Sequence, residues 1–562
     1  MSDTLDNVNL NLKAKKEHTY DAIVIGSGIS GGWAAKELCE KGLKTLVLER
    51  GRNVEHVKDY PTAMKEVWEF RHRLERFGKP GRREDTAHFF IDRKDHPYEE
   101  IKPFSWVRGY QVGGKSLMWA RMVQRWSNID FEANARDGFG VDWPIRYEDL
   151  APWYSHVEKF IGVSGSKEGL PQLPDGEFLP AMELNCLEKH IKARIEATFP
   201  GRNLIMSRQA NLTQAHNGRG ACQYRNRCAR GCPYGAYFSS NSSTLPAAQA
   251  TGNLTVRPFS VVHSIIYDEQ AQKASGVRVI DSETMETMEF YASIIFVNAS
   301  TLNSTLILLN SISGRFPNGL GNDSGVLGHY LMDHNYRGRI NATYEGMRDK
   351  YYFGKRPAAG YIPRYRNFGN DKRDNYLRGY AYSLGASRGR GNLTDDDPKI
   401  GAVFKEKLTE VGKWSVWMTG MGEHLPYFEN HVRLSNEKTD KWGIPQLEID
   451  CEYKENEMKM LDDILNDGAE MLEAAGLADI RTADSQGHPG QGIHEMGTAR
   501  MGLDPKTSIL NGHNQMHAVK NVFVSDGACM TSSACQNPSI TYMALTARAA
   551  NYAVEELKKM NI

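Results

Sequence analysis

The stretch that most constrains the fold of this chain is a glycine-rich turn between two short apolar runs. Residues 21–51 read DAIVIGSGISGGWAAKELCEKGLKTLVLERG. The apolar runs at 21–25 and 46–48 predict buried strands, and residues 32–41 predict a helix with small residues on one side. Strand, tight turn, helix and strand in this order are typical of a dinucleotide-binding unit in an α/β fold.

Each glycine of the turn has a separate physical role. Gly26 permits the sharp turn, Gly28 lets the backbone approach a pyrophosphate, and Gly31 lets the helix pack on the strand. Glu49, about twenty residues further on, can accept hydrogen bonds from ribose hydroxyls, and the helix N-terminus stabilises negative charge. The candidate cofactor residues of this stretch are Gly26, Ser27, Gly28, Ser30, Gly31, Glu49 and Arg50.

Length and charge limit the classes of partner. At 562 residues the chain is long enough for two joined domains. Lys and Arg together number 69, as do Asp and Glu, so the balanced charge gives no case for nucleic acid or an anionic membrane as partner. We expect a small, uncharged or weakly charged substrate.

No stretch of the chain has the pattern of a targeting or membrane segment. The first twenty residues are polar, and no run of about eighteen apolar residues follows. We therefore expect a soluble protein without direct membrane insertion. Its compartment is the cytoplasm, or the periplasm if a partner subunit carries the export signal.

A second glycine loop follows at residues 108–121, RGYQVGGKSLMWAR. Paired glycines before a small hydroxyl residue suit a loop whose backbone N–H groups face a phosphate or a flavin edge. Gly113, Gly114 and Ser116 are the candidates. An ordinary turn would explain the loop alone, whereas the first motif favours a return of the chain to the same cofactor.

Two further regions predict sheets. Short β-rich runs between 253 and 298, including 289–291 and 293–297, predict strands that close a sheet near the dinucleotide. Residues 337–484 alternate aromatic and polar side chains, which predicts a half-exposed antiparallel sheet. This sheet is either one wall of a substrate pocket or a plain solvent-facing sheet. Residues 63–77 show helical spacing and predict a segment that covers the cofactor domain.

The eight cysteines are too few for a disulfide framework in a chain of this length. Three of them, Cys222, Cys228 and Cys232, lie within eleven residues. The final Cys-Pro is typical of iron–sulfur ligands, and nearby cations favour thiolates. The nearby cations are Arg225, Arg227 and Arg230. Three thiolates match a [3Fe-4S] cluster; zinc would need a fourth ligand such as His216, and free thiols in a loop are the third alternative.

Seven ordered motifs give the chain a family resemblance from Tyr20 to its C-terminus. Besides the two glycine loops these are Asp142-Trp-Pro, Gly328-His-Tyr-Leu-Met-Asp333-His334, Asn430-His-Val-Arg-Leu434, His494-Glu-Met-Gly-Thr-Ala-Arg500-Met-Gly502 and Asn537-Pro538-Ser-Ile-Thr541. In this order they resemble the glucose-methanol-choline (GMC) oxidoreductase family. The resemblance implies a Rossmann-type FAD-binding domain with a second, substrate-binding domain on a mostly antiparallel sheet.

The resemblance also implies a discontinuous domain organisation. The expected FAD-binding segments are 18–52, 104–130, 216–335 and 485–562. The expected substrate-binding and covering segments are 53–103, 131–215 and 336–484.

The sugar-oxidising branch of the family, with pyranose 2-oxidases and bacterial sugar dehydrogenases, is the most similar. It implies that His494 is the base that removes the hydroxyl proton and that Asn537 orients the carbon over flavin N5. The resemblance further implies that Trp119, Val262, Asp526, Gly527 and Pro538 contact FAD.

One position departs from the pyranose oxidases of this branch. They carry a histidine, which binds FAD covalently, where this chain has Met118. A thioether cannot form that linkage, so we expect dissociable FAD.

The cysteine segment is similar to the one that binds a [3Fe-4S] cluster in bacterial glucose, fructose and gluconate dehydrogenases. This similarity implies electron transfer to cytochrome c or a quinone, with a small partner subunit. The expected activity is that of an FAD-dependent sugar or glycoside dehydrogenase acting at C3, as in glucoside 3-dehydrogenases, or at the anomeric carbon; an oxygen-using oxidase is the alternative.

Overall fold

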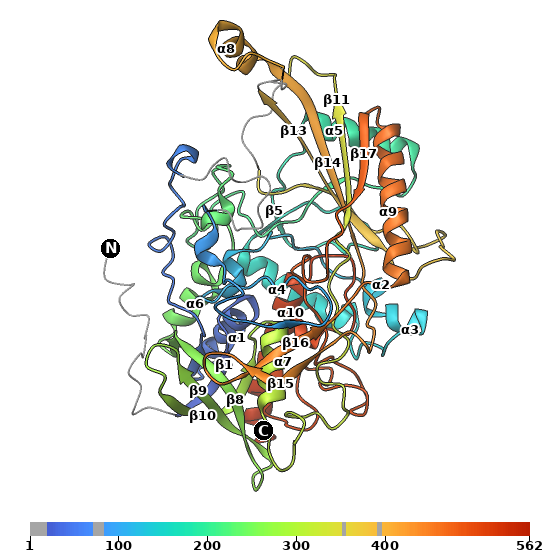
Figure 1. Cartoon of the computed structure of the whole chain (residues 1–562). Helices are drawn as coiled ribbons and strands as arrows, with labels where there is room; N and C mark the ends of the chain where they lie inside the picture. Colours follow the sequence, from blue (N-terminus) through green and yellow to red (C-terminus); the bar gives the residue numbers. More distant parts are fainter. Residues whose placement is uncertain (1–18, 71–83, 351–355, 391–395) are drawn as a thin grey trace.

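The structure, a computed structural model, describes residues 19–70, 84–350, 356–390 and 396–562. Two large sheets organise this part of the chain. A mostly parallel sheet with packed helices forms the lower half of the molecule in Figure 1, and a long antiparallel sheet forms the upper half. The expected α/β fold class is confirmed.

The first sheet has seven strands in the order β7-β2-β1-β10-β9-β8, with β18 also paired to β10. Its strands are β1 (Thr19–Ile25), β2 (Thr45–Leu48), β7 (Leu254–Arg257), β8 (Ser260–Asp268), β9 (Lys273–Asp281), β10 (Thr287–Val297) and β18 (Val522–Val524). Strands β7, β2, β1, β10 and β18 are parallel, and β8 and β9 form an antiparallel extension. The runs predicted at 289–291 and 293–297 are one strand, β10, whose first half pairs with β9 and whose second half pairs with β18.

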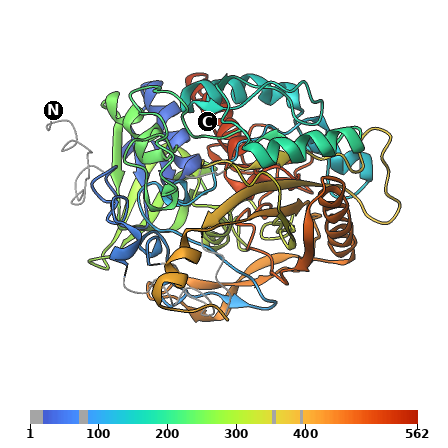
Figure 2. The ribbon, with the colours of Figure 1, turned by 90° about the horizontal axis from the view of Figure 1, so that it is seen from above.

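Helices from distant parts of the chain cover this sheet (Figure 2). They are α1 (Ile29–Glu40), α4 (Tyr147–Ile161), α6 (Thr244–Ala250), α7 (Thr301–Asn310) and α10 (Ser539–Lys558). Helix α1 packs against α6 and α10, and α10 packs against α4. Small buried residues such as Ala34, Ala35 and Ala550 allow this close packing.

The second sheet has six strands in the order β17-β11-β14-β13-β12-β6 and is antiparallel throughout. Its strands are β6 (Ile205–Met206), β11 (Gly338–Tyr344), β12 (Gly360–Ile362), β13 (Tyr380–Arg390), β14 (Val411–Gly422) and β17 (Ala478–Asp484). Along β14, Trp414, Val416 and Met418 are buried, whereas Ser415 and Trp417 are exposed. This alternation confirms the half-exposed antiparallel sheet.

Helices α5 (Cys186–Thr198) and α9 (Glu455–Ala474) cover one face of this sheet (Figure 1). Apolar residues of α9 at helical spacing, among them Met460, Ile464 and Met471, are fully buried. Ile464 lies where side chains on Gly338 and Gly420 would be, because a Cβ there would lie 2.5 Å and 2.3 Å from its Cγ2. Glycine in these strands therefore allows the helix to approach the sheet.

Smaller elements complete the fold. They are α2 (Asn128–Phe131), α3 (Ala133–Asp137), α8 (Gly401–Thr409), β3 (Glu99–Glu100), β4 (Val163–Ser164), β5 (Phe178–Leu179), β15 (His431–Thr439) and β16 (Pro445–Asp450). Helix α8 lies at the tip of the β13–β14 hairpin, away from the body of the molecule (Figure 1). Strands β15, β16 and β3 form a small sheet of their own.

Two further expectations concern single segments. The helical spacing predicted over 63–77 corresponds, within the described residues, to the 3-10 turn Val67–Glu69; residues 71–83 lie outside the described part. No helix among the described residues is both long and apolar enough to cross a membrane. The division of the chain into cofactor-binding and covering segments stays a prediction.

Candidate active site

A cavity of about 550 Å³ is lined by residues from both large sheets. Ile25 and Leu48 from the parallel sheet line it, and so do Ser383 of β13 and Met421 of β14. This volume is typical of a site for a small molecule or cofactor.

Three long helices begin at the wall of this cavity. The first residues of α1, α7 and α10, which are Ile29, Thr301 and Ser539, all line it. The N-terminus of a helix carries partial positive charge and unpaired N–H groups. The convergence of three such ends favours an anionic ligand.

The first glycine turn has the geometry that its sequence predicts. Gly26 has φ +95°, and a Cβ there would lie 2.4 Å from the Asn298 carbonyl oxygen. A Cβ on Gly31 would lie 1.9 Å from the Gly26 carbonyl oxygen, so helix and turn touch. A Cβ on Gly28 would meet no atom within 4 Å and would occupy open space at the cavity wall. The space at Gly28 fits a ligand that approaches the backbone closely.

Glu49 lies buried beside this turn. Its carboxylate accepts hydrogen bonds from the Ser27 N–H (3.2 Å), the Ser27 hydroxyl (2.5 Å) and the Gly51 N–H (3.0 Å). Burial raises the pKa of Glu49, and these donors oppose the rise. The guanidinium of Arg50, next to it, lies 4.7 Å from the centre of the Tyr110 ring and 4.5 Å from that of the Trp442 ring.

The second glycine loop meets the first turn, but its residues divide into two roles. Gly114 and Trp119 line the cavity. Gly113 has φ +96° and donates its N–H to the Ser27 hydroxyl at 2.9 Å. Ser116 donates its hydroxyl to the Gly113 carbonyl (2.5 Å) and accepts the Ser240 N–H (3.0 Å), so it holds the loop and does not face the cavity.

Most of the other predicted cofactor residues also line the cavity. Together with Gly114 and Trp119, the wall contains Gly26, Ser27, Gly28, Ser30, Glu49, Arg50, Val262, Asp526 and Gly527. Gly31, Gly113, Ser116 and Pro538 lie next to the wall and are not part of it. The Asp526 carboxylate accepts the Ser304 hydroxyl at 2.5 Å, and burial raises its pKa to about 6.

The cavity wall also has buried polar atoms without a hydrogen-bond partner among the described residues. They are Arg50 Nε, Asn298 Nδ2, Glu495 Oε1, Asn537 Oδ1 and the Tyr542 hydroxyl. Such atoms cost free energy unless a ligand or water binds them. A long polar ligand with an anionic centre, such as FAD, fits this wall.

The two predicted catalytic side chains lie together in the cavity. His494 Nε2 is 3.3 Å from Asn537 Nδ2, and both residues line the wall. Burial is the main cause that holds the pKa of His494 well below its usual 6.5, and the charges of His334 and Lys115 act in the same direction. A neutral imidazole that can accept a proton therefore faces the cavity.

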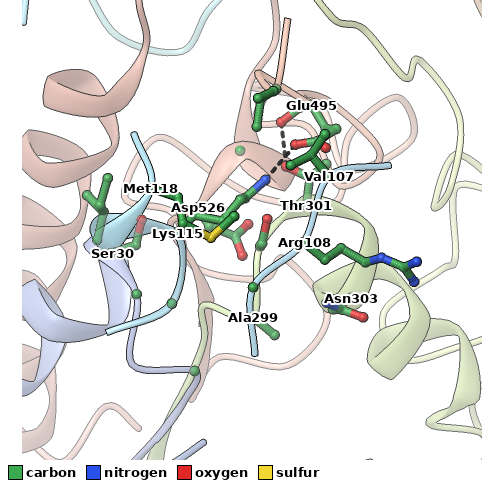
Figure 3. Close-up of a pocket in the computed structure, with 18 of the residues that line it drawn as sticks. Ser30, Val107, Arg108, Lys115, Met118, Ala299, Thr301, Asn303, Glu495 and Asp526 are labelled. Atoms are coloured by element: carbon green, nitrogen blue, oxygen red, sulfur yellow. Dashed lines mark hydrogen bonds and ion pairs between the residues drawn. The ribbon is translucent and has the colours of Figure 1, made fainter. Parts of the chain in front are cut away.

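Several functional candidates were not assigned a role from the sequence. His334 Nδ1 lies 2.8 Å from His494 Nδ1, although 160 residues separate the two. Lys115 of the glycine loop forms a 2.8 Å ion pair with Glu495, and the two side chains point toward each other in the cavity (Figure 3). In the sequence, the signal that pointed to His334 was its place beside Asp333 in one of the ordered motifs. That motif did not indicate that His334 contacts His494.

The three clustered cysteines do not line this cavity. Among the described residues, only Asp333, His334 and His494 form a group of three potential metal ligands within 4.8 Å of one another. The three thiols are thus not gathered around a single zinc position. Iron–sulfur ligation by these three cysteines stays a prediction.

At Cys222, the expectation that nearby arginines favour the thiolate is wrong. Each arginine is bound elsewhere: Arg225 donates to the Ala63 carbonyl, Arg227 pairs with Glu66, and Arg230 pairs with Asp85. Burial raises the pKa of Cys222, so its neutral form is favoured. The arginines instead attach the cysteine loop to Ala63, Glu66 and Asp85, which lie much earlier in the chain.

Comparison with known proteins gives one family and several distant relatives. Sequence models of the GMC oxidoreductase family match residues 20–336 and 426–546. A 2-methyl-1,2-propanediol dehydrogenase from Mycolicibacterium austroafricanum is 28% identical over 545 residues, covering 95% of this chain and 94% of the relative. The fructose dehydrogenase large subunit of Gluconobacter japonicus is 24% identical and covers 96% and 98%.

A solved structure shows the same fold. Pyridoxine 4-oxidase from Mesorbium loti superimposes with a TM-score of 0.61 at 17% identity, covering 95% of this chain and 99% of the other. Because the family's N-terminal model alone spans more than half of the chain, the match is not confined to one motif. The chain belongs to the GMC oxidoreductase family, whose members are FAD-dependent enzymes that oxidise hydroxyl-bearing carbons.

Proposed function

We propose that this protein is an FAD-dependent dehydrogenase that oxidises a hydroxyl group of a sugar or glycoside. The observation that supports it most directly is the neutral His494 imidazole beside Asn537 in the cavity that the glycine turns also line. FAD, when bound, supplies the hydride acceptor. Gly28, Glu49, Gly114 and Asp526 are the residues that would hold it.

His494 and Asn537 would divide the work on the substrate hydroxyl. The hydroxyl oxygen accepts a hydrogen bond from Asn537 Nδ2, while its proton moves to His494 Nε2. As the O–H bond breaks, the oxygen lone pair forms the carbonyl and the hydride leaves the same carbon with its electron pair. Asn537 thereby orients the carbon that reacts.

Neutral polar and aromatic side chains support a polyhydroxylated substrate. Tyr336, Ser383 and Gln491 line the cavity, from the segment that leads into β11, from β13 and from the segment before His494. Such groups recognise hydroxyls without requiring a substrate charge. Within this class we propose oxidation of a ring secondary hydroxyl at C3 to a keto sugar. This position rests on similarity alone, and product analysis that finds only lactone would contradict it.

Met118 supports a dissociable cofactor. Its side chain lines the cavity, and its sulfur lies 3.8 Å from Gln111 Nε2. Because a thioether forms no histidyl linkage, acid precipitation of the holoenzyme should release all FAD into the supernatant. Flavin that stays with the precipitate would contradict this proposal.

We further propose that electrons leave to an external acceptor, such as cytochrome c or a quinone, with a small subunit as partner. The names of two relatives, a dehydrogenase and a dehydrogenase large subunit, support an acceptor other than oxygen. A [3Fe-4S] cluster at Cys222, Cys228 and Cys232 is the hypothesis for the exit route, and it rests on sequence similarity. The same proposal places the protein in a compartment where it can meet such a partner, either the cytoplasm or the periplasm.

The decisive experiment is an anaerobic absorbance titration of the holoenzyme with a panel of sugars, glycosides and small diols, together with an iron assay. We expect sugars to bleach the flavin in the wild type and His494→Gln to slow bleaching at least about 100-fold with normal FAD content. No bleaching by any sugar would overturn the substrate class. Rapid reoxidation by air without bound iron would favour the oxidase alternative.

A further inference from the structure

Behind the catalytic histidine lies a second buried histidine that joins it to the backbone. His334 Nε2 lies 3.0 Å from the Ala534 carbonyl oxygen, and His334 Nδ1 lies 2.8 Å from His494 Nδ1. The two rings are perpendicular, with centroids 4.9 Å apart. His334 is fully buried and does not line the cavity, so substrate does not reach it.

These contacts allow only one arrangement of protons on two neutral rings. The Ala534 carbonyl only accepts hydrogen bonds, so His334 Nε2 carries the proton and its Nδ1 carries the lone pair. His494 must then donate its Nδ1–H to His334, which leaves the lone pair of His494 on Nε2. That nitrogen faces Asn537 in the cavity.

Asp333 fixes the backbone that carries His494. Its buried carboxylate accepts the N–H groups of Gly490 (2.7 Å), Gly492 (2.9 Å) and His494 (3.1 Å). A side chain cannot shift far when its own backbone is held at three points. Asp333 and His334 are neighbours in sequence, so one short segment holds both the main chain and the ring of His494.

We propose that His334 is a positioning residue that selects the tautomer of His494 with a free lone pair on Nε2. Asp333 holds the backbone of His494 in place for this contact. The proposal rests on His494 being the base of the proposed function. In the opposite tautomer Nε2 would carry a proton and could not accept one from the substrate. His334 also remains a hydrogen-bond acceptor for Nδ1–H after His494 has gained the substrate proton, which stabilises the imidazolium.

Two substitutions separate this role from simple packing. In His334→Asn the amide oxygen can take the place of Nδ1 and still accept the His494 proton. His334→Leu fills similar space and cannot accept it. We expect His334→Leu to slow anaerobic flavin reduction at least about 100-fold with a smaller change in KM, and His334→Asn to recover at least about tenfold of that loss.

The matched control is His190→Leu. His190 Nε2 also lies 3.0 Å from a backbone carbonyl, that of Ala475, but outside the cavity. This variant should reduce its flavin at the wild-type rate. Reduction of His334→Leu within threefold of wild type, or equal losses in the Leu and Asn variants with normal FAD content, would overturn the proposal.

A measurement on the wild-type holoenzyme keeps the test valid if the variants do not fold. In protein labelled with ¹⁵N-histidine, the His494 signals are identified as those lost in His494→Gln. We expect a protonated Nδ1 and an unprotonated Nε2 at neutral pH, and the reverse would overturn the proposal. A base role that fails shows itself separately, as normal flavin reduction in His494→Gln.

Discussion

At the scale of single residues, the site depends on burial to keep ionisable groups in useful protonation states. Burial holds the pKa of His494 well below 6.5 and raises the pKa of Asp333 and Asp526 to about 6. The histidine is thus neutral and able to accept a proton across the physiological range. His494 and Asp526 line the cavity, and ionisable groups with shifted pKa values in one cavity are typical of a functional site.

This shift predicts the acid limit of activity. Because the pKa of His494 is lowered, its proton-accepting form persists as pH falls through 6.5 and is lost only at more acidic pH. We expect the acid limb of kcat/KM for anaerobic flavin reduction to lie below pH 6.5, where an unshifted histidine would lose half its activity. Stopped-flow reduction rates between pH 5 and 8 test this, and a limb at or above 6.5 would contradict it.

At the scale of elements, the sequence predicted those strands, turns and helices that depend on a local pattern of residues. The strand, turn and helix around Gly26 are found as expected, because each glycine acts on atoms only a few residues away. Contacts between distant segments were missed: His334 meets His494 across 160 residues, and Lys115 meets Glu495 across 380. Ser116 was expected to face the cofactor, but its hydroxyl bonds inside its own loop and to Ser240.

Replacement by alanine should affect stability differently at two glycines of the first turn. Gly31→Ala should lower the Tm of the apoprotein, because its Cβ would lie 1.9 Å from a backbone oxygen and overpacking costs about 1–3 kcal/mol or more. Gly28→Ala should leave that Tm nearly unchanged, because its Cβ meets no atom, and should weaken FAD binding at least about tenfold because the methyl fills the approach to the backbone.

Thermal unfolding of the two apoproteins and FAD titration by flavin fluorescence measure both effects. Equal loss of Tm in the two variants would show that the turn tolerates no added carbon anywhere. Unchanged FAD affinity in Gly28→Ala would place the cofactor away from this turn.

At the scale of the whole molecule, the two sheets contribute different parts of the cavity wall. The parallel sheet and its helices supply the glycine turns, Glu49 and Asp526, whereas the antiparallel sheet supplies Ser383 and Met421. The fold class and the antiparallel sheet were predictable from the periodic spacing of apolar and polar residues. The way in which the sheets meet was not, because no local pattern records which faces pack together.

This division predicts that changes on β13 alter substrate use and leave the cofactor alone. Ser383→Val should change kcat/KM at least about threefold between two sugars, with normal FAD content, because Ser383 lines the cavity. Ser387→Val, on the same strand and exposed, is the matched control and should behave as wild type. Loss of FAD in Ser383→Val would show that the strand supports the cofactor instead.

The three helix N-termini at the cavity wall also bear on the driving force of the reaction. Their partial positive charges are fixed by the backbone, need no reorganisation, and act on any group that gains electrons in this space. A cofactor whose reduced part lay near these helix ends would accept negative charge more readily than it does in water, and we expect its reduction potential to be raised. In the proposed enzyme, the folded backbone itself would then strengthen the oxidation of the substrate.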